Sequence, residues 1–109
     1  MKKIMSATEM ALRVIGRKGT FIILETLQKG PARFTTLEKV LKVSPRTLSE
    51  RLKELEEQGV VNRQAFPEVP PRVEYSLTEK GEALKPLLDS VGEWAVSFDK
   101  PKKKVVKKK

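Results

Sequence analysis

The segment VSPRTLSERLKELEEQGVV, residues 43–61, predicts one amphipathic helix with both of its ends marked. Ser44 is a good N-cap residue, and Pro45 suits the first helical position, where no backbone amide is needed. Apolar residues then recur at helical spacing and mark the buried face: Leu48, Leu52 and Leu55. Gly59 ends the pattern, so we expect a helix over residues 45–58.

Polar side chains occupy the outward face of this helix and its flanks: Arg46, Thr47, Ser49, Glu50, Arg51 and Lys53. At roughly one hundred degrees per residue, Arg46, Glu50 and Lys53 lie opposite the leucine stripe, whereas Arg51 lies nearer the buried edge. Arginine binds guanine through two hydrogen bonds, and lysine pairs with phosphate. Serine and threonine hydroxyls form hydrogen bonds with either base edges or phosphate. Any solvated helix also shows charged residues outside, so the neighbouring elements must decide between the two interpretations.

Three further helices are expected before this one. Ser6 with Glu9, and Thr35 with Glu38, form capping boxes that open the first and the third of them. The apolar residues within 20–29 wrap most of the helix circumference, which predicts a central buried helix between those two.

After Gly59 the apolar period changes from that of a helix to that of a strand. Residues 60–66 and 72–77 are predicted as strands, and the second alternates apolar and polar side chains. The intervening PEVPP segment, residues 67–71, contains three prolines, which cannot donate to a strand ladder. We therefore expect a two-stranded hairpin with a stiff, exposed loop.

The last predicted helix runs from Thr78 to about Phe98. Pro86 lies inside it and removes one backbone hydrogen bond, so we expect a kink near Glu82. A stripe at three- and four-residue spacing follows the helix: Leu84, Leu87, Leu88, Val91, Trp94, Ala95 and Phe98. The core of a small domain is not expected to reach the large apolar side chains Trp94 and Phe98, which lie far beyond the hairpin in the sequence. We expect a homodimer through this face, with the N-terminal helix joining in; packing on the helix's own domain is the alternative.

The order of elements predicts the fold class. A short helix, a tight turn and the Ser44-capped helix form a helix-turn-helix, and the hairpin behind it is a wing. We expect a mainly α fold with a two-stranded β-hairpin wing, that is, a winged helix-turn-helix with a C-terminal dimerisation helix over residues 1–99. A generic α+β domain with a hairpin is the alternative. Residues 100–109 lack a core-forming pattern and are expected to form a disordered Lys-rich tail.

The composition excludes several classes of function. The chain has 109 residues with no cysteine and no histidine, which removes disulfides, thiolate nucleophiles, the usual zinc sites and the commonest general base. No nucleophile–base pair can be assembled, so an enzyme is not expected, and neither is a cofactor; a carboxylate-only metal site stays open. The longest apolar run, FIIL, is far too short for a membrane span, so we expect a cytoplasmic protein with no membrane partner.

The positive charge is concentrated at one end. Residues 100–109 carry seven of the 23 basic residues and no acidic residue, whereas residues 1–99 are left with a net charge of +2. Such a tail fits a sequence-independent DNA arm, because each neutralised phosphate releases counterions. A merely solubilising end and a nuclear-import signal are the alternatives.

The sequence also resembles a known family. The segments 43–61 and 67–78 (PEVPPRVEYSLT), with Gly81, Leu84, Pro86, Leu87 and Trp94 after them, resemble the HxlR-type winged-helix transcription regulators, relatives of the MarR group. The resemblance covers roughly residues 20–96. It implies a dimeric prokaryotic or archaeal DNA-binding regulator with the Ser44-capped helix in the major groove and the wing on the DNA backbone.

Three features depart from that family's pattern. Members usually carry a cysteine near the N-terminus, which some use to sense reactive carbonyls or oxidants, and this chain has none. Gly19 stands where a tryptophan is common. The Lys-rich tail is not part of the pattern either. Thiol sensing in the manner of the family is therefore out of reach for this chain.

These observations predict a sequence-specific, nucleoid-associated transcription regulator that binds pseudo-palindromic double-stranded DNA as a homodimer. Arg46 is expected to read a base, while Arg51 and Arg72, at the wing base, are expected to hold phosphate. The full set of expected DNA contacts is Ser44, Arg46, Thr47, Ser49, Glu50, Arg51, Lys53, Arg63 and Arg72. A non-specific chromatin-type DNA binder or a winged-helix protein-interaction module is the alternative, and the sequence does not reveal a small-molecule effector.

Overall fold

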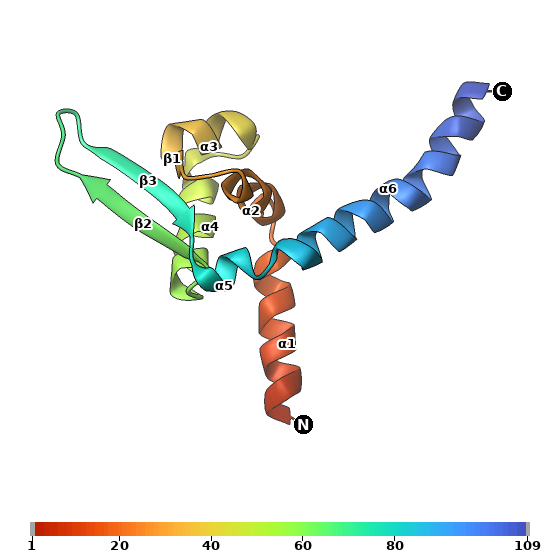
Figure 1. The fold of residues 1–109 in the computed structure, drawn as a ribbon, viewed down its shortest axis with the longest axis horizontal. Helices are drawn as coiled ribbons and strands as arrows, with labels where there is room; N and C mark the ends of the chain where they lie inside the picture. Colours follow the sequence, from red (N-terminus) through yellow and green to blue (C-terminus); the bar gives the residue numbers. More distant parts are fainter. Residues whose placement is uncertain (1, 109) are drawn as a thin grey trace.

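A computed structural model describes the backbone of residues 2–108 and the side chains of residues 6–98. Along the chain the elements are α1 (Lys2–Ile15), α2 (Thr20–Gln28), β1 (Ala32–Arg33), α3 (Phe34–Val40), α4 (Pro45–Glu57), β2 (Val61–Phe66), β3 (Arg72–Leu77), α5 (Glu79–Glu82) and α6 (Lys85–Lys108). Helices α2 to α5 and the sheet form one body, from which α1 and α6 project in different directions (Figure 1). The expected winged helix-turn-helix fold is confirmed.

The core lies where helices α2, α3 and α4 meet the sheet. The leucine stripe of α4 is buried, as predicted, against apolar side chains of its neighbours: Ile23 and Leu24 from α2, Leu37 from α3, and Val61 and Tyr75 from the strands. Helix α2 is thus the central buried helix, because β3, α1, α3 and α6 all pack against it. Burial of the stripe on this side leaves the opposite face of α4 in solvent.

The sheet has one strand more than expected. The hairpin strands β2 and β3 agree with prediction to within one residue, and β1 adds to the other edge of β3 through Ala32 and Arg33. A two-residue strand is too short to show an alternating pattern. Its pairing depends on a partner more than 40 positions along the chain, so local sequence did not reveal it.

One of the three predicted helix caps, Ser44, is present, and Thr78 caps a further helix. Ser44 caps α4 and Thr78 caps α5, each accepting a hydrogen bond from the backbone amide three residues later. The expected capping boxes at Ser6 and Thr35 are wrong. Helix α1 begins at Lys2, so Ser6 lies inside it, and α3 begins directly after β1, with Arg33 at the cap position and no side-chain cap.

The last helix is divided rather than kinked. Helix α5 ends at Glu82, and α6 begins at Lys85, with Pro86 as its second residue. A proline in the first helical turn needs no amide partner, so Pro86 starts a new helix instead of bending an old one. The backbone of α6 then stays helical to Lys108, whereas a disordered tail was expected from residue 100. Lysine is a good helix former, which favours extension of the helix although Pro101 within this stretch cannot donate a backbone hydrogen bond.

Candidate DNA-binding interface

The N-terminus of α4 is rigidly capped at the surface. The Ser44 Oγ accepts a hydrogen bond from the Thr47 amide at 3.1 Å and also lies 3.0 Å from the Thr47 hydroxyl. Pro45 occupies the first helical position, as predicted. The hydroxyls of Ser44 and Thr47 are thus hydrogen-bonded to each other. The cap fixes the direction in which the next side chains leave the helix.

The outward face of α4 is free, as the helical spacing predicted. Arg46, Ser49, Glu50 and Lys53 are all exposed, and the side chain of Arg46 is 89% exposed. Arg46 Nε lies 3.5 Å from Glu50 Oε2, one helical turn away. A surface ion pair of this kind holds two side chains together loosely, with about 0.3–0.5 kcal/mol. A basic donor and an acidic acceptor therefore stand side by side on a face that no part of the described chain covers.

Arg51 lies at the buried edge of α4, as the helical spacing predicted. Its side chain is only 13% exposed, and its Nε donates a hydrogen bond to the Lys18 carbonyl at 3.0 Å. Its Nη1 lies 3.9 Å from carboxylate oxygens of both Glu50 and Glu54. The Arg51 guanidinium thus faces partners within the protein, and the phosphate contact expected of Arg51 stays a prediction.

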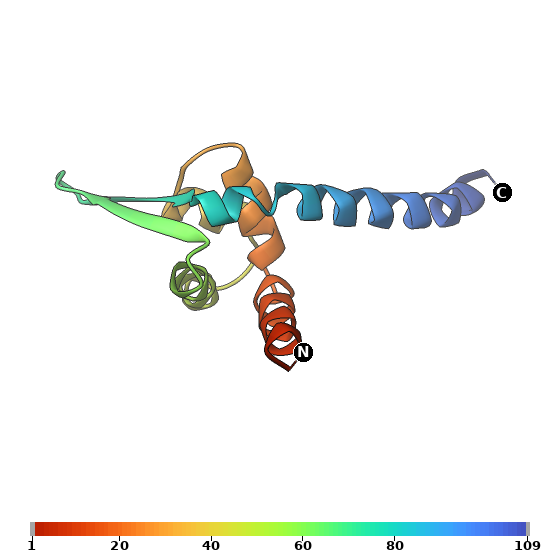
Figure 2. The same ribbon diagram turned by 60° about the horizontal axis from the view of Figure 1, so that its bottom comes forward.

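Arg63 on the wing lies on the same side of the molecule as α4. It stands directly opposite Tyr75 in the β2–β3 register, and directly opposed residues share one face of a sheet. Tyr75 and Val61 are buried on that face, against which α4 packs. Arg63 lies farther out along the hairpin and is exposed. Figure 2 shows α4 nearly end-on on one side of the hairpin, so α4 and Arg63 flank a common space.

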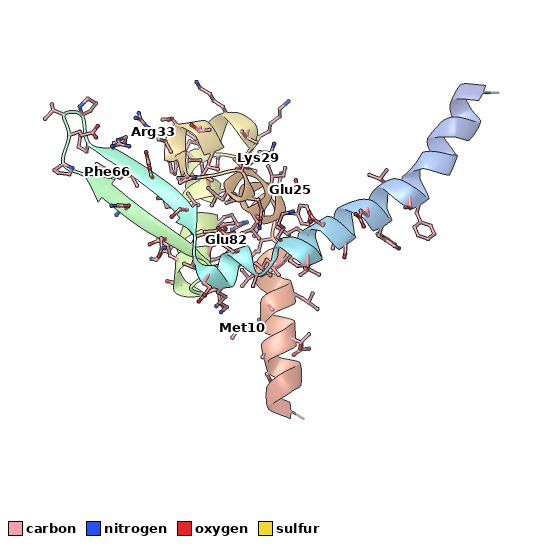
Figure 3. The ribbon with its side chains drawn as sticks, viewed as in Figure 1. Met10, Glu25, Lys29, Arg33, Phe66 and Glu82 are labelled. Carbon is pink, nitrogen blue, oxygen red and sulfur yellow. The ribbon has the colours of Figure 1, made fainter. Side chains whose placement is uncertain are left out.

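Arg72 lies on the opposite face of the hairpin, across from Phe66 in the register. Its Nε and Nη2 donate to Glu68 at 3.0 and 2.6 Å, its Nη1 donates to Glu74, and its guanidinium lies 3.9 Å from the Phe66 ring centroid. The hydrogen bond from Arg72 lowers the pKa of Glu68 below its ordinary value. Arg72 therefore organises the wing, near whose tip Phe66 lies (Figure 3), and the phosphate contact expected of it stays a prediction.

The apolar stripe of α6 divides between the core and the surface. Leu88 is buried in the core, and Leu84 is half-buried against it, so these two predicted interface residues serve their own domain. The rest of the stripe is exposed, with Trp94 at 65% and Phe98 at 69%, and the exposed members are Leu87, Val91, Trp94, Ala95 and Phe98. The rings of Trp94 and Phe98 lie 5.5 Å apart. A continuous apolar face therefore points away from the body.

Helix α1, which the sequence predicts to join in self-association, carries a second exposed apolar surface. All side chains from Ser6 to Arg13 are exposed, including Met10 and Leu12. Figure 3 shows Met10 standing out from a helix that leaves the body. The signal was present in the sequence as the amphipathic spacing of this helix, but spacing does not say whether a stripe meets its own core.

Lys42 is a further basic residue, absent from the set of DNA contacts expected from the sequence. It is exposed in the turn between α3 and α4, two residues before the Ser44 cap. Its position at the helix-turn-helix turn is the signal that could have found it. Within the described side chains, no group of acidic residues could hold a metal ion, and no described helix is long and apolar enough to cross a membrane.

Comparison with known proteins agrees with this geometry. The family model of HxlR-like helix-turn-helix proteins matches residues 14–103. An uncharacterized HTH-type transcriptional regulator of Methanothermobacter thermautotrophicus is 44% identical over 93 residues, 84% of this chain and 71% of that protein. The uncharacterized HTH-type transcriptional regulator YvaP of Bacillus subtilis is 45% identical over 94 residues, 85% of this chain and 87% of that protein.

Solved structures show the same similarity. The reduced form of the transcriptional regulator YodB from B. subtilis superposes with a TM-score of 0.75 at 39% identity, covering 85% of this chain and 92% of that one. Residues matched by the family model include α2 to α5, the sheet and most of α6. The chain therefore belongs to the HxlR-like helix-turn-helix transcriptional regulators, DNA-binding proteins related to the MarR group.

Proposed function

We propose that this protein regulates transcription by binding a specific, pseudo-palindromic DNA sequence as a homodimer. The observation that carries the proposal is the free outward face of α4, where Arg46 and Glu50 stand just behind a capped N-terminus. Residues at the start of such a helix are the ones that reach base edges when it enters the major groove.

The chemistry of this face supports base recognition. An arginine binds the O6 and N7 of guanine through two hydrogen bonds, and a glutamate accepts from the N4 amino group of cytosine. Arg46 and Glu50 supply one group of each kind, one helical turn apart. We assign Ser44, Thr47 and Ser49 to supporting polar contacts, and Lys42, Lys53 and Arg63 to phosphates on either side of the groove.

The two projecting helices support a dimer. The stripe of α6, with Leu87, Val91, Trp94 and Phe98, and the apolar face of α1, with Met10 and Leu12, are both exposed. A twofold dimer that buries them would present two α4 helices to successive major grooves, about 34 Å apart, which is why we expect a pseudo-palindromic site.

The basic tail supports attraction to DNA of any sequence. Its seven lysines would add positive charge to a body that carries only +2 over residues 1–99. We propose that it increases the affinity for DNA backbone and keeps the protein on the nucleoid, without contributing to base preference.

Selection of bound sequences from a random DNA pool tests the specificity. An enriched palindrome is the expected result. Flat enrichment with a steep salt dependence would instead favour a non-specific chromatin-type binder, and absence of DNA binding would favour a protein-interaction module. Sedimentation at micromolar concentration tests the dimer, and a monomer there would refute it.

A further inference from the structure

A cluster of polar groups ties the middle of α4 to the turn that follows α1. We name it the Arg51 clasp: Arg17, the carbonyl of Lys18, Arg51 and Glu54. Arg51 Nε donates to the Lys18 carbonyl at 3.0 Å across 33 positions of sequence, and Arg17 Nη2 lies 2.7 Å from Glu54 Oε2. Both links are charge-assisted, which makes them stronger and more directional than neutral hydrogen bonds.

The clasp joins the body to a helix that otherwise reaches the core near its C-terminal end, where Val14 packs against it. Helix α1 leaves the body through the turn of residues 16–19 and has exposed side chains from Ser6 to Arg13 (Figure 1). The turn contains two glycines, of which Gly19 takes the left-handed conformation at φ +88°. Glycine backbone accepts many conformations, so the turn alone leaves the direction of α1 weakly determined. Arg51 and Glu54 hold the turn from the side of α4.

We infer that Arg51 and Glu54 are positioning residues that set the half-site spacing of the DNA sequence. By fixing the angle between α4 and α1, they fix the separation of the two α4 helices in a dimer that uses α1. This inference rests on the homodimer proposed above. It also explains a nearly buried arginine on a helix whose other basic residues, Arg46 and Lys53, are exposed. The guanidinium fork holds a backbone carbonyl in one direction, which a lysine could not do equally well.

The absence of cysteine from the chain makes the angle directly measurable. Ser49→Cys places one spin label on α4 of each protomer, and Ser90→Cys places one on α6; both serines are exposed. Electron–electron double resonance then reports one inter-chain distance for each label. In the Arg51→Met background we expect the α4 distances to spread about twofold wider, while the α6 distances keep their width.

The second arm measures DNA binding by the unlabelled protein. Duplexes carry either one half-site or two half-sites whose spacing is changed by one or two base pairs. We expect the parent protein to lose about tenfold or more in affinity on a changed spacing, and Arg51→Met to lose less than about threefold, with single half-site affinity nearly unchanged. Arg17→Gln, at a position 45% exposed, should give the same effect more weakly and guards against misfolding of the first variant. Lys29→Gln, which removes a charge at the end of α2, is the control.

The outcomes separate the inference from the proposed function. Equal losses on single half-sites and on all spacings would mean that Arg51 contacts DNA, and unchanged distances and spacing preference in both clasp variants would mean that the clasp positions nothing; either result overturns the inference. The absence of inter-chain distances in the parent protein would refute the dimer itself, and the inference with it. A parent protein without base preference would refute specific recognition, while the distance measurement still decides whether the clasp holds α1.

Discussion

Replacement of Arg46 by alanine tests DNA recognition by α4 most directly. The side chain is 89% exposed and touches only Glu50, at 3.5 Å and itself 54% exposed, so the folded protein depends on it little. We expect the free energy of unfolding to change by less than about 0.5 kcal/mol. Any larger loss of DNA binding must then come from the interaction with DNA.

The expected loss of binding follows from the chemistry of the pair and the symmetry of the dimer. A bidentate arginine–guanine pair contributes about 1–3 kcal/mol of discrimination against the wrong base. A dimer forms the pair twice, in half-sites too far apart to share partners, so the losses add to about 2–6 kcal/mol. The lower bound corresponds to an affinity about 30-fold weaker on the preferred palindrome.

Fluorescence anisotropy at one fixed salt concentration measures the effect on the preferred palindrome and on its single-base variants. Arg46→Ala should erase the preference at one base position per half-site and retain it elsewhere. Arg46→Lys separates a base contact from a phosphate contact, because lysine keeps the charge but loses the two-pronged geometry. If Arg46→Ala left affinity and preference unchanged at every position, α4 would not read DNA as proposed, and the protein-interaction alternative would become the better one.

Three further predictions concern the dimer, the tail and the wing. Trp94→Asp should yield a folded monomer by sedimentation and circular dichroism, because the side chain is exposed within one chain and apolar neighbours are expected only from a second copy; a dimer of undiminished affinity would contradict this. Deletion of residues 100–109 should reduce the slope of log K against log salt by about 0.9 for each phosphate that the tail no longer neutralises, and should leave base preference intact; an unchanged slope would show that the tail does not touch DNA. Since Arg72 lowers the pKa of Glu68 from 4.5, the stabilisation by their hydrogen bonds is present above that pH and is lost as the pH falls through the lowered value. Glu68→Gln should therefore flatten the loss of stability in acid, measured by urea unfolding at a series of pH values, and identical pH profiles would show that this ion pair does not stabilise the wing.

Local sequence determined the start of α4 and the loop of the wing, whose causes lie within a few residues. Ser44 followed by Pro45 predicts the start of α4 because cap and first turn are adjacent in the chain, and the prolines of 67–71 predict the wing loop because they cannot join a ladder. Helical spacing also predicted that Arg46 would lie opposite the buried leucines, and the structure places it there. The pattern at Thr35 fits a helix cap, but α3 begins at Phe34, directly after β1, so Thr35 lies inside the helix.

Only the tertiary structure determines whether a given face of a helix or strand packs on the core, contacts another segment or remains in solvent. Periodicity put Leu88 and Trp94 on one stripe, but the break before α6 turns Leu88 into the core and leaves Trp94 in solvent. The same limit applies to the two arginines expected to hold phosphate. Arg51 is occupied by a carbonyl 33 positions away, and Arg72 by carboxylates that the register of the hairpin brings to its side of the sheet. Repeat spacing specifies which side chains share a direction, whereas the partner in that direction depends on how distant segments pack, and a strand of two residues such as β1 exists only through such packing.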